Sequence, residues 1–221
     1  MAENTDKGRK GRMRTFSVPL GLLDYINPVF YTITTLTIRR HMGEFMGPLA
    51  IRIYMAGALL SLIGGYIIPT GKLIVGLGLI KFVMPVPLVF AVNSGILVSG
   101  LVLLGTVFSL PVPVTGLLAA AIALCLVLVL KKTGKFNTLA VLTGAAGYLM
   151  LYASLTALSL AGGKAVPVVL YAVAVCLFAA LVLTGCRADL YDARVHWFIE
   201  ISNVLCQGAV ALGTLILFGA L

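Results

Sequence analysis

The chain has 221 residues, of which 61% are hydrophobic and only 10% are charged. A soluble domain usually carries roughly 25% charged residues, so this composition excludes an ordinary water-facing surface. The apolar runs are long and lack strand-like alternation, which excludes a β-barrel and predicts an all-α, polytopic integral membrane helix bundle.

The first 15 residues form a basic tail that we expect in the cytoplasm. Its cations are Lys7, Arg9, Lys10, Arg12 and Arg14. Other cations fall in the gaps between apolar runs, which is the pattern of positive-inside loops. The net charge of +9 therefore indicates membrane orientation and contact with anionic membrane lipids, and we expect no nucleic-acid partner.

Residues 16–45 precede the clear apolar runs and are interpreted as an interfacial or re-entrant segment. Their first part is long enough to cross a bilayer but contains Asp24, Asn27 and Pro28. We expect it to lie in the inner interface, or to enter and return on the same side at Asn27-Pro28.

The arrangement of residues 46–87 depends on whether 16–38 crosses the membrane. Runs 46–69 and 73–87 would form an out-and-back pair of crossings. The alternative lets 16–38 span the membrane and makes 73–87 re-entrant. It places more arginine and lysine outside, so the positive-inside rule favours the first arrangement.

Residues 46–221 form the predicted transmembrane bundle. Its six clear apolar runs are 46–69, 88–109, 112–130, 137–162, 165–185 and 195–220. Either arrangement of the first third gives about seven crossings, with the N-terminus in and the C-terminus out. We place the protein in the cytoplasmic (inner) membrane.

Small residues recur every four positions on two of these runs. One face is Gly57, Ser61 and Gly65, and the other is Ala91, Gly95 and Ser99. Such faces let helices approach closely, within the chain or between copies in a homo-oligomer. Asn93 lies on the second run and is interpreted either as a packing hydrogen bond or as a substrate contact.

The last apolar run carries a polar stripe, which is the sharpest functional signal in the chain. Its members are Asp189, Asp192, His196, Glu200, Asn203 and Gln207. Intervals of three or four residues place all six on one helical face. A charge in hydrocarbon costs about 3 kcal/mol or more, so Glu200 must face protein or water.

The stripe has a structural and a functional interpretation. The outer acids can cap the helix, and the deeper residues can form interhelical hydrogen bonds with one buried ion pair. Arg52 and Lys81 are the candidate counter-charges, and Arg52 is expected either to pair with Glu200 or to extend its side chain to the lipid headgroups. The functional interpretation is a polar pathway for a solute, proton or cation.

Enzyme and cofactor signatures are missing from the sequence. Asp192, His196 and Glu200 could ligate one metal ion, but other helices supply few acids to complete the site, so we expect no metal and no cofactor. No nucleophile elbow, zinc-protease helix or phosphate loop occurs.

Three functions remain open. The first is a small transporter or channel for a small solute or ion, with Glu200 binding or relaying charge and His196 shuttling protons. Asn203, Gln207, Asp192, Arg52 and Asn93 complete this candidate pathway. The second is a non-catalytic membrane subunit or scaffold. The third is a lipid-modifying membrane enzyme, with Asp192, His196 and Glu200 as its acid–base set.

Overall fold

The computed structural model describes residues 17–79, 86–134, 136–187 and 193–220, and these residues fold as helices joined by short turns. The expected basic tail, 1–15, lies outside the described residues. Among the described residues, six helices are long and apolar enough to cross a membrane. They are α4 (Pro48–Gly76), α5 (Val86–Val107), α6 (Val112–Thr133), α7 (Phe136–Ala161), α8 (Ala165–Arg187) and α9 (Ala193–Leu217). The all-α, polytopic bundle predicted from composition is confirmed.

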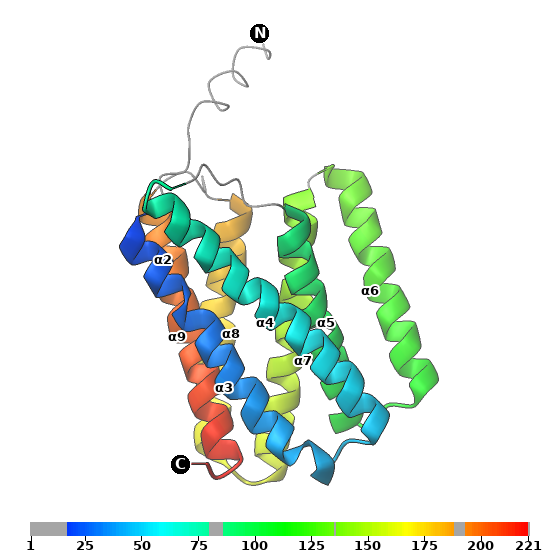
Figure 1. The fold of residues 1–221 in the computed structure, drawn as a ribbon. Helices are drawn as coiled ribbons and strands as arrows, with labels where there is room; N and C mark the ends of the chain where they lie inside the picture. The colour runs from blue at the N-terminus through cyan, green and yellow to red at the C-terminus, as the bar shows by residue number, and fades with distance from the viewer. Residues whose placement is uncertain (1–16, 80–85, 135, 188–192, 221) are drawn as a thin grey trace.

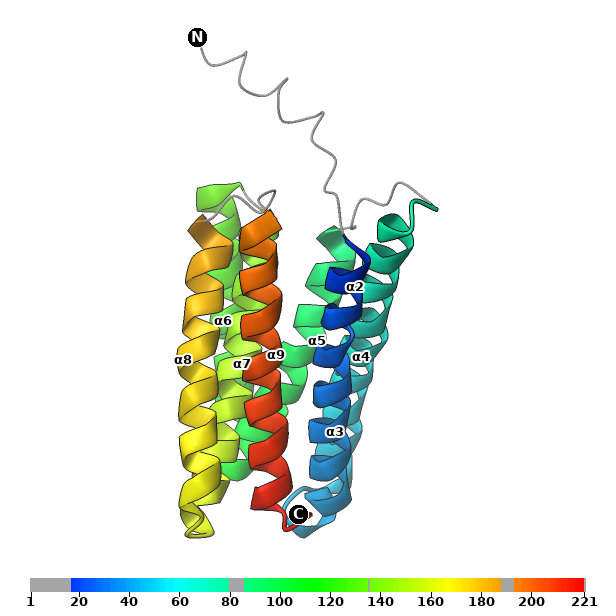
Figure 2. The same ribbon diagram turned by 90° about the vertical axis from the view of Figure 1, so that its left-hand side faces the viewer.

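Two shorter helices precede the six. Helix α2 (Val18–Asp24) and helix α3 (Ile26–His41) follow one another along the length of the bundle (Figure 1). Figure 2 shows the same pair beside α4, extending from one end of the bundle to the other. Among the described residues, α2 and α3 together count as one pass along the bundle, and with the six long helices they give seven passes. Helix α2 begins at what we call the upper end, and α9 finishes at the opposite, lower end.

The structure differs from the arrangement expected for residues 16–45. Instead of lying across one end or turning back at Asn27-Pro28, the segment continues downward as α3. Pro28 interrupts the helix rather than reversing it, because proline has no amide to donate to the carbonyl of Asp24. Ser17 caps the start of α2 by accepting a hydrogen bond from the Leu20 amide at 3.4 Å.

The expected out-and-back pair formed by 46–69 and 73–87 is also wrong. Helix α4 is continuous from Pro48 to Gly76 and passes through both Pro69 and Lys72. It stops where Gly78 adopts a left-handed conformation with φ of +73°, which suits a residue without a Cβ. Residues 80–85, which include Lys81, lie outside the described part of the chain.

Helices α4, α5 and α7 pack closely through small residues, and the faces of α4 and α5 are the two predicted from the sequence. A Cβ built on Gly95 of α5 would lie 2.5 Å from the Gly57 carbonyl oxygen of α4. On the other side of α5, a Cβ on Gly147 of α7 would lie 2.5 Å from the Leu97 amide nitrogen. Because Ser61 and Ser99 are buried in this packing, these faces serve contacts within the chain.

We expect Gly147→Ala to destabilise the bundle by about 1–3 kcal/mol, because the added methyl group forces two backbones apart. The matched control is Gly116→Ala in α6, where a Cβ would meet nothing within 4 Å. Thermal unfolding of both variants in the same detergent measures the difference. If the two substitutions had equal effects, the close α5–α7 contact would be contradicted.

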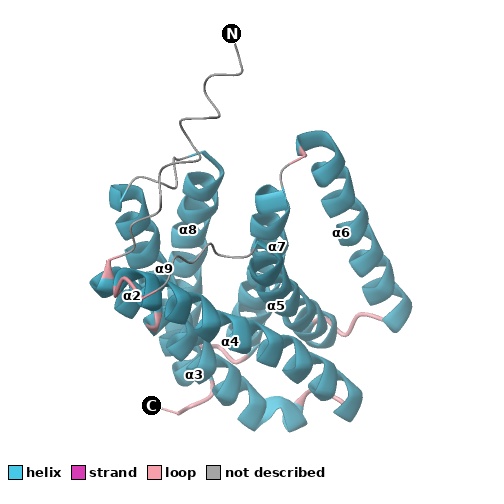
Figure 3. Ribbon diagram, turned by 45° about the horizontal axis from the view of Figure 1, so that its top comes forward, coloured by secondary structure: helices cyan, strands magenta, loops and turns pink. Residues whose placement is uncertain are grey.

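Helix α6 stands at the edge of the bundle, beside α5 and α7 (Figure 3). None of residues 113–132 is buried within the described structure. Leu117 and Leu124 are among its most exposed side chains. This helix therefore presents most of its apolar surface to whatever surrounds the bundle.

Candidate functional site

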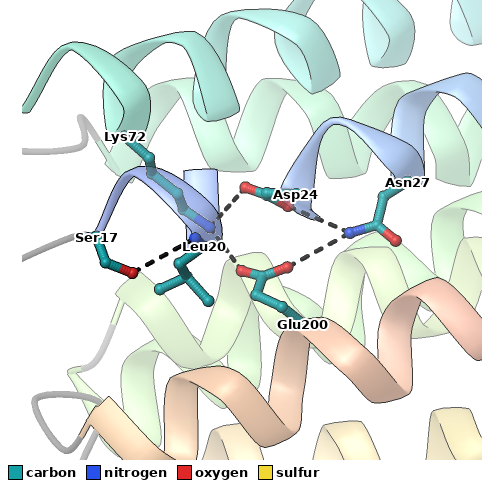
Figure 4. Close-up of polar contacts among 6 residues, drawn as sticks. All are labelled: Ser17, Leu20, Asp24, Asn27, Lys72 and Glu200. Carbon is teal, nitrogen blue, oxygen red and sulfur yellow. Dashed lines mark hydrogen bonds and ion pairs between the residues drawn. The ribbon is translucent and has the colours of Figure 1, made fainter. Parts of the chain in front are cut away.

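A ring of polar side chains is buried in the upper half of the bundle, where α2 ends. It consists of Asp24 from α2, Asn27 from α3, Lys72 from α4 and Glu200 from α9 (Figure 4). Each is at most 8% exposed. Three parts of the chain that are far apart in the sequence, the α2–α3 pair, α4 and α9, thus contribute side chains to a single cluster.

Lys72 bridges the two carboxylates. Its Nζ lies 2.6 Å from Asp24 Oδ2 and 2.7 Å from Glu200 Oε1. The remaining oxygen of each carboxylate faces Asn27. The Asn27 Nδ2 group donates to Asp24 Oδ1 at 3.2 Å and to Glu200 Oε2 at 3.4 Å. Every carboxylate oxygen in the ring therefore has a cationic or amide neighbour.

The local sequence explains how these side chains meet. The break between α2 and α3 places Asp24 at the end of one helix and Asn27 in the first turn of the next. Continuity of α4 past Pro69 carries Lys72 to the same depth. Gly21 permits the contact between α2 and α4, because a Cβ there would lie 3.2 Å from the Leu73 backbone.

Charge in the ring does not balance. With all groups ionised, two carboxylates surround one ammonium group, which leaves one surplus negative charge in a buried site. Burying an unbalanced charge costs several kcal/mol, so this arrangement favours binding of a proton or a small cation. The surplus is the main electrostatic property of the site.

A cavity of about 130 Å³ adjoins the ring. Asp24 and Asn27 form part of its wall, and Asn203, Gln207 and Tyr148 contribute further polar groups. The Asn27 Oδ1 atom is buried and has no hydrogen-bond partner among the described residues. An acceptor is therefore available at the junction between the charged ring and the cavity.

Two of the residues that line the cavity are prolines. Pro28 and Pro69 both line it, and neither can donate the amide that a regular helix requires. Pro69 leaves the Gly65 carbonyl without its usual intrahelical donor, and Gly65 is itself a wall residue. Helix α4 nevertheless continues past Pro69, so this carbonyl lies beside the cavity within an unbroken helix.

The structure brings together part of the predicted stripe. Glu200 belongs to the ring, and Asn203 and Gln207 line the cavity. His196 lies on α9 one turn before Glu200, partly exposed, and is not among the cavity-lining residues. Asp189 and Asp192 fall outside the described residues.

Two predicted pathway residues lie elsewhere. Asn93 donates from Nδ2 to the Ala140 carbonyl at 2.8 Å, which ties α5 to α7. Arg52 is exposed near the start of α4, whereas Lys72 near the other end of the same helix pairs with Glu200. The expected Arg52–Glu200 pair is therefore wrong.

Sequence reasoning missed Lys72 and undervalued Asp24. Lys72 follows Gly71 between two apolar runs and resembles a loop residue. The available signal was that apolar residues continue on both sides of Pro69 and Lys72, up to Gly76. Reading them as one helix would have placed a lysine inside an apolar segment, where it requires an acidic partner.

Within the described residues, no group of three or more His, Cys, Asp or Glu side chains is arranged to hold a metal ion. Comparison of the chain with models of protein families, with curated proteins and with solved structures gave no match.

Proposed function

We propose that this protein is a small proton- or cation-coupled membrane transporter whose binding site is the ring of Asp24, Asn27, Lys72 and Glu200 with its adjoining cavity. The observation that carries the proposal is the pairing of two buried carboxylates with one buried lysine. A purely structural ion pair needs one acid. The second acid creates a place for one exchangeable positive charge.

The coupling charge binds where the ring is electrically incomplete. A proton on either carboxylate, or a small cation between them, neutralises the surplus negative charge. Loss of that charge restores the attraction of both acids for Lys72. Because Asp24 belongs to α2 and Glu200 to α9, occupancy changes how strongly these helices are held to α4. Such a differential interaction can shift a conformational equilibrium.

The solute occupies the polar cavity. Its volume of about 130 Å³ fits several water molecules or one small polar molecule. The unpartnered Asn27 Oδ1 atom favours a solute with an N–H or O–H donor. Asn203 and Gln207 provide both donors and acceptors on the α9 side. We therefore propose a small polar solute rather than a lipid.

The other two functions receive less support. An acid–base role for Glu200 in lipid chemistry requires access to substrate, but this side chain is 4% exposed and ion-paired. A scaffold would use small-residue faces for assembly, yet the faces on α4 and α5 pack against one another. The ring and cavity have no evident purpose in a scaffold.

The test uses the full chain in proteoliposomes adsorbed to a capacitive sensor. A rapid proton-concentration jump should give a transient current that is absent from protein-free vesicles. A panel of small amines, amino acids and sugars is then tested for solute-dependent currents. Arg52→Gln, which removes an exposed cation on the same helix as Lys72, should retain the response. Absence of any protein-dependent current, with protons or with sodium, would overturn the proposal.

A further inference from the structure

We infer that the groove between α5, α6 and α7 binds one acyl chain of an anionic phospholipid, with the lipid headgroup on Lys131 and Lys132. This site lies on different residues from the ring and its cavity. It rests on a second cavity, of about 350 Å³, whose walls come from these three helices alone. Its occupant is identified by the chemistry of the walls, their depth and the charges at their end.

The walls are apolar. Among the described residues, the hydroxyl side chains that line the groove are Ser94 and Thr143. Each already donates within its own helix, Ser94 to the Phe90 carbonyl and Thr143 to the Leu139 carbonyl, both at 2.8 Å. Water requires two to four polar partners in a cavity, and this groove offers no unused donor. A hydrocarbon occupant therefore fits and water does not.

The groove has the depth of one membrane leaflet. Its residues on α6 extend from Ala119 to Leu130, which is about 16 Å at 1.5 Å per residue. Half of a hydrocarbon core of about 30 Å is roughly 15 Å. A volume of about 350 Å³ accommodates on the order of ten methylene groups. An acyl chain lying along α6 matches both dimensions.

Positive charge marks the end of the groove. Leu130 is the last wall residue on α6, and the next two residues, Lys131 and Lys132, are exposed at the upper end of the bundle. Cations at this depth attract phosphate and other anionic headgroup atoms. A single lipid can thus place its chain beside Leu130 and its phosphate at the two lysines.

The alternative occupant of this groove is a second copy of the chain. A second copy would have to insert its own side chains into the groove to form a stable interface. The paired lysines at the mouth of the groove disfavour an identical chain, which would bring its own net positive charge of +9. Charge complementarity therefore favours the anionic lipid.

The test places a tryptophan in the groove by Phe90→Trp, combined with Trp197→Phe to remove the native indole on α9. Delipidated protein in detergent micelles is titrated with phosphatidylglycerol or phosphatidylcholine carrying brominated acyl chains, which quench nearby indoles. We expect phosphatidylglycerol to quench at a mole fraction roughly fivefold or more below that of phosphatidylcholine. The unaltered protein, with only Trp197, reports ordinary surrounding lipid and should show little preference.

Two further variants locate the headgroup and the chain. Lys131→Gln with Lys132→Gln should remove the preference for phosphatidylglycerol, whereas Arg39→Gln with Arg40→Gln, at the lower end, should retain it. Ala123→Phe fills the groove and should abolish the saturable quenching. Equal quenching by the two lipids in the reporter protein would overturn the inference. So would a concentration-dependent dimer, seen by sedimentation, that excludes lipid from the reporter.

Discussion

Replacing Lys72 by methionine is expected to lower the free energy of unfolding by about 3–5 kcal/mol, the typical cost of removing one partner from a buried ion pair. Asp24 and Glu200 would then lie close together without their bridging cation. The midpoint of thermal unfolding in detergent should fall by roughly 10 °C. A fluorescence-monitored melt or circular dichroism at 222 nm measures this shift.

Arg52→Met is the matched control for Lys72→Met. It removes a cation from the same helix, but Arg52 is exposed, and such substitutions change stability by about 0.5 kcal/mol or less. A triple variant that restores stability tests whether the loss in Lys72→Met comes from the two unpaired carboxylates. Adding Asp24→Asn and Glu200→Gln to Lys72→Met leaves a neutral ring of similar shape and should recover most of the lost stability. Equal melting points for Lys72→Met and Arg52→Met would contradict the buried ion pairs.

Composition and periodicity were sufficient to predict the six long helices. Their apolar runs agree with α4 to α9 to within a few residues, apart from the longer upper end of α4. Small residues at intervals of four predicted a close helix approach on each of two runs, and the structure shows these two faces meeting at Gly57 and Gly95. Helix positions and small-residue faces depend on residues near one another in the sequence, so each can be recognised within a single helix.

The first third of the chain was less predictable because its folding depends on partners distant in sequence. Asp24 and Asn27 made residues 16–38 look too polar to traverse the bundle. In the structure Asp24 pairs with Lys72 of α4, and the Asn27 amide group donates a hydrogen bond to Glu200 of α9. The positive-inside count treated Lys72 as a loop cation, although it is buried at 6% exposure.

The deeper half of the polar stripe was predictable as a buried face, but its ion-pair partner was not. Glu200, Asn203 and Gln207 face the interior because their helix packs against α3 and α7 on that side. The sequence alone could not identify the cation that pairs with Glu200, because an ion pair between α4 and α9 depends on how the two helices pack in three dimensions. Arg52 and Lys72 lie 20 positions apart on one helix, and only the second reaches Glu200.

Replacing Glu200 by glutamine is expected to abolish proton-driven current while leaving the bundle folded. The remaining Asp24–Lys72 pair, at 2.6 Å, is electrically balanced, and the glutamine amide can still accept a hydrogen bond from Lys72. We expect the free energy of unfolding to change by about 1 kcal/mol or less. The transient current after a proton jump should fall at least tenfold, because the exchangeable charge no longer has a second carboxylate to bind.

The two carboxylates should show strong non-additivity. Asp24→Asn alone also leaves one acid for Lys72, so its stability should resemble that of Glu200→Gln. The double variant leaves Lys72 buried without a carboxylate in the ring and should lose about 3–5 kcal/mol, far more than the sum of the single changes.

Asn203→Ala provides a functional control, since it alters the cavity wall and leaves the ring intact. It should retain the proton current and weaken solute-dependent currents. If Glu200→Gln instead retained full current, the surplus carboxylate would have no coupling role, whereas additive stability losses would show that the two acids do not share Lys72.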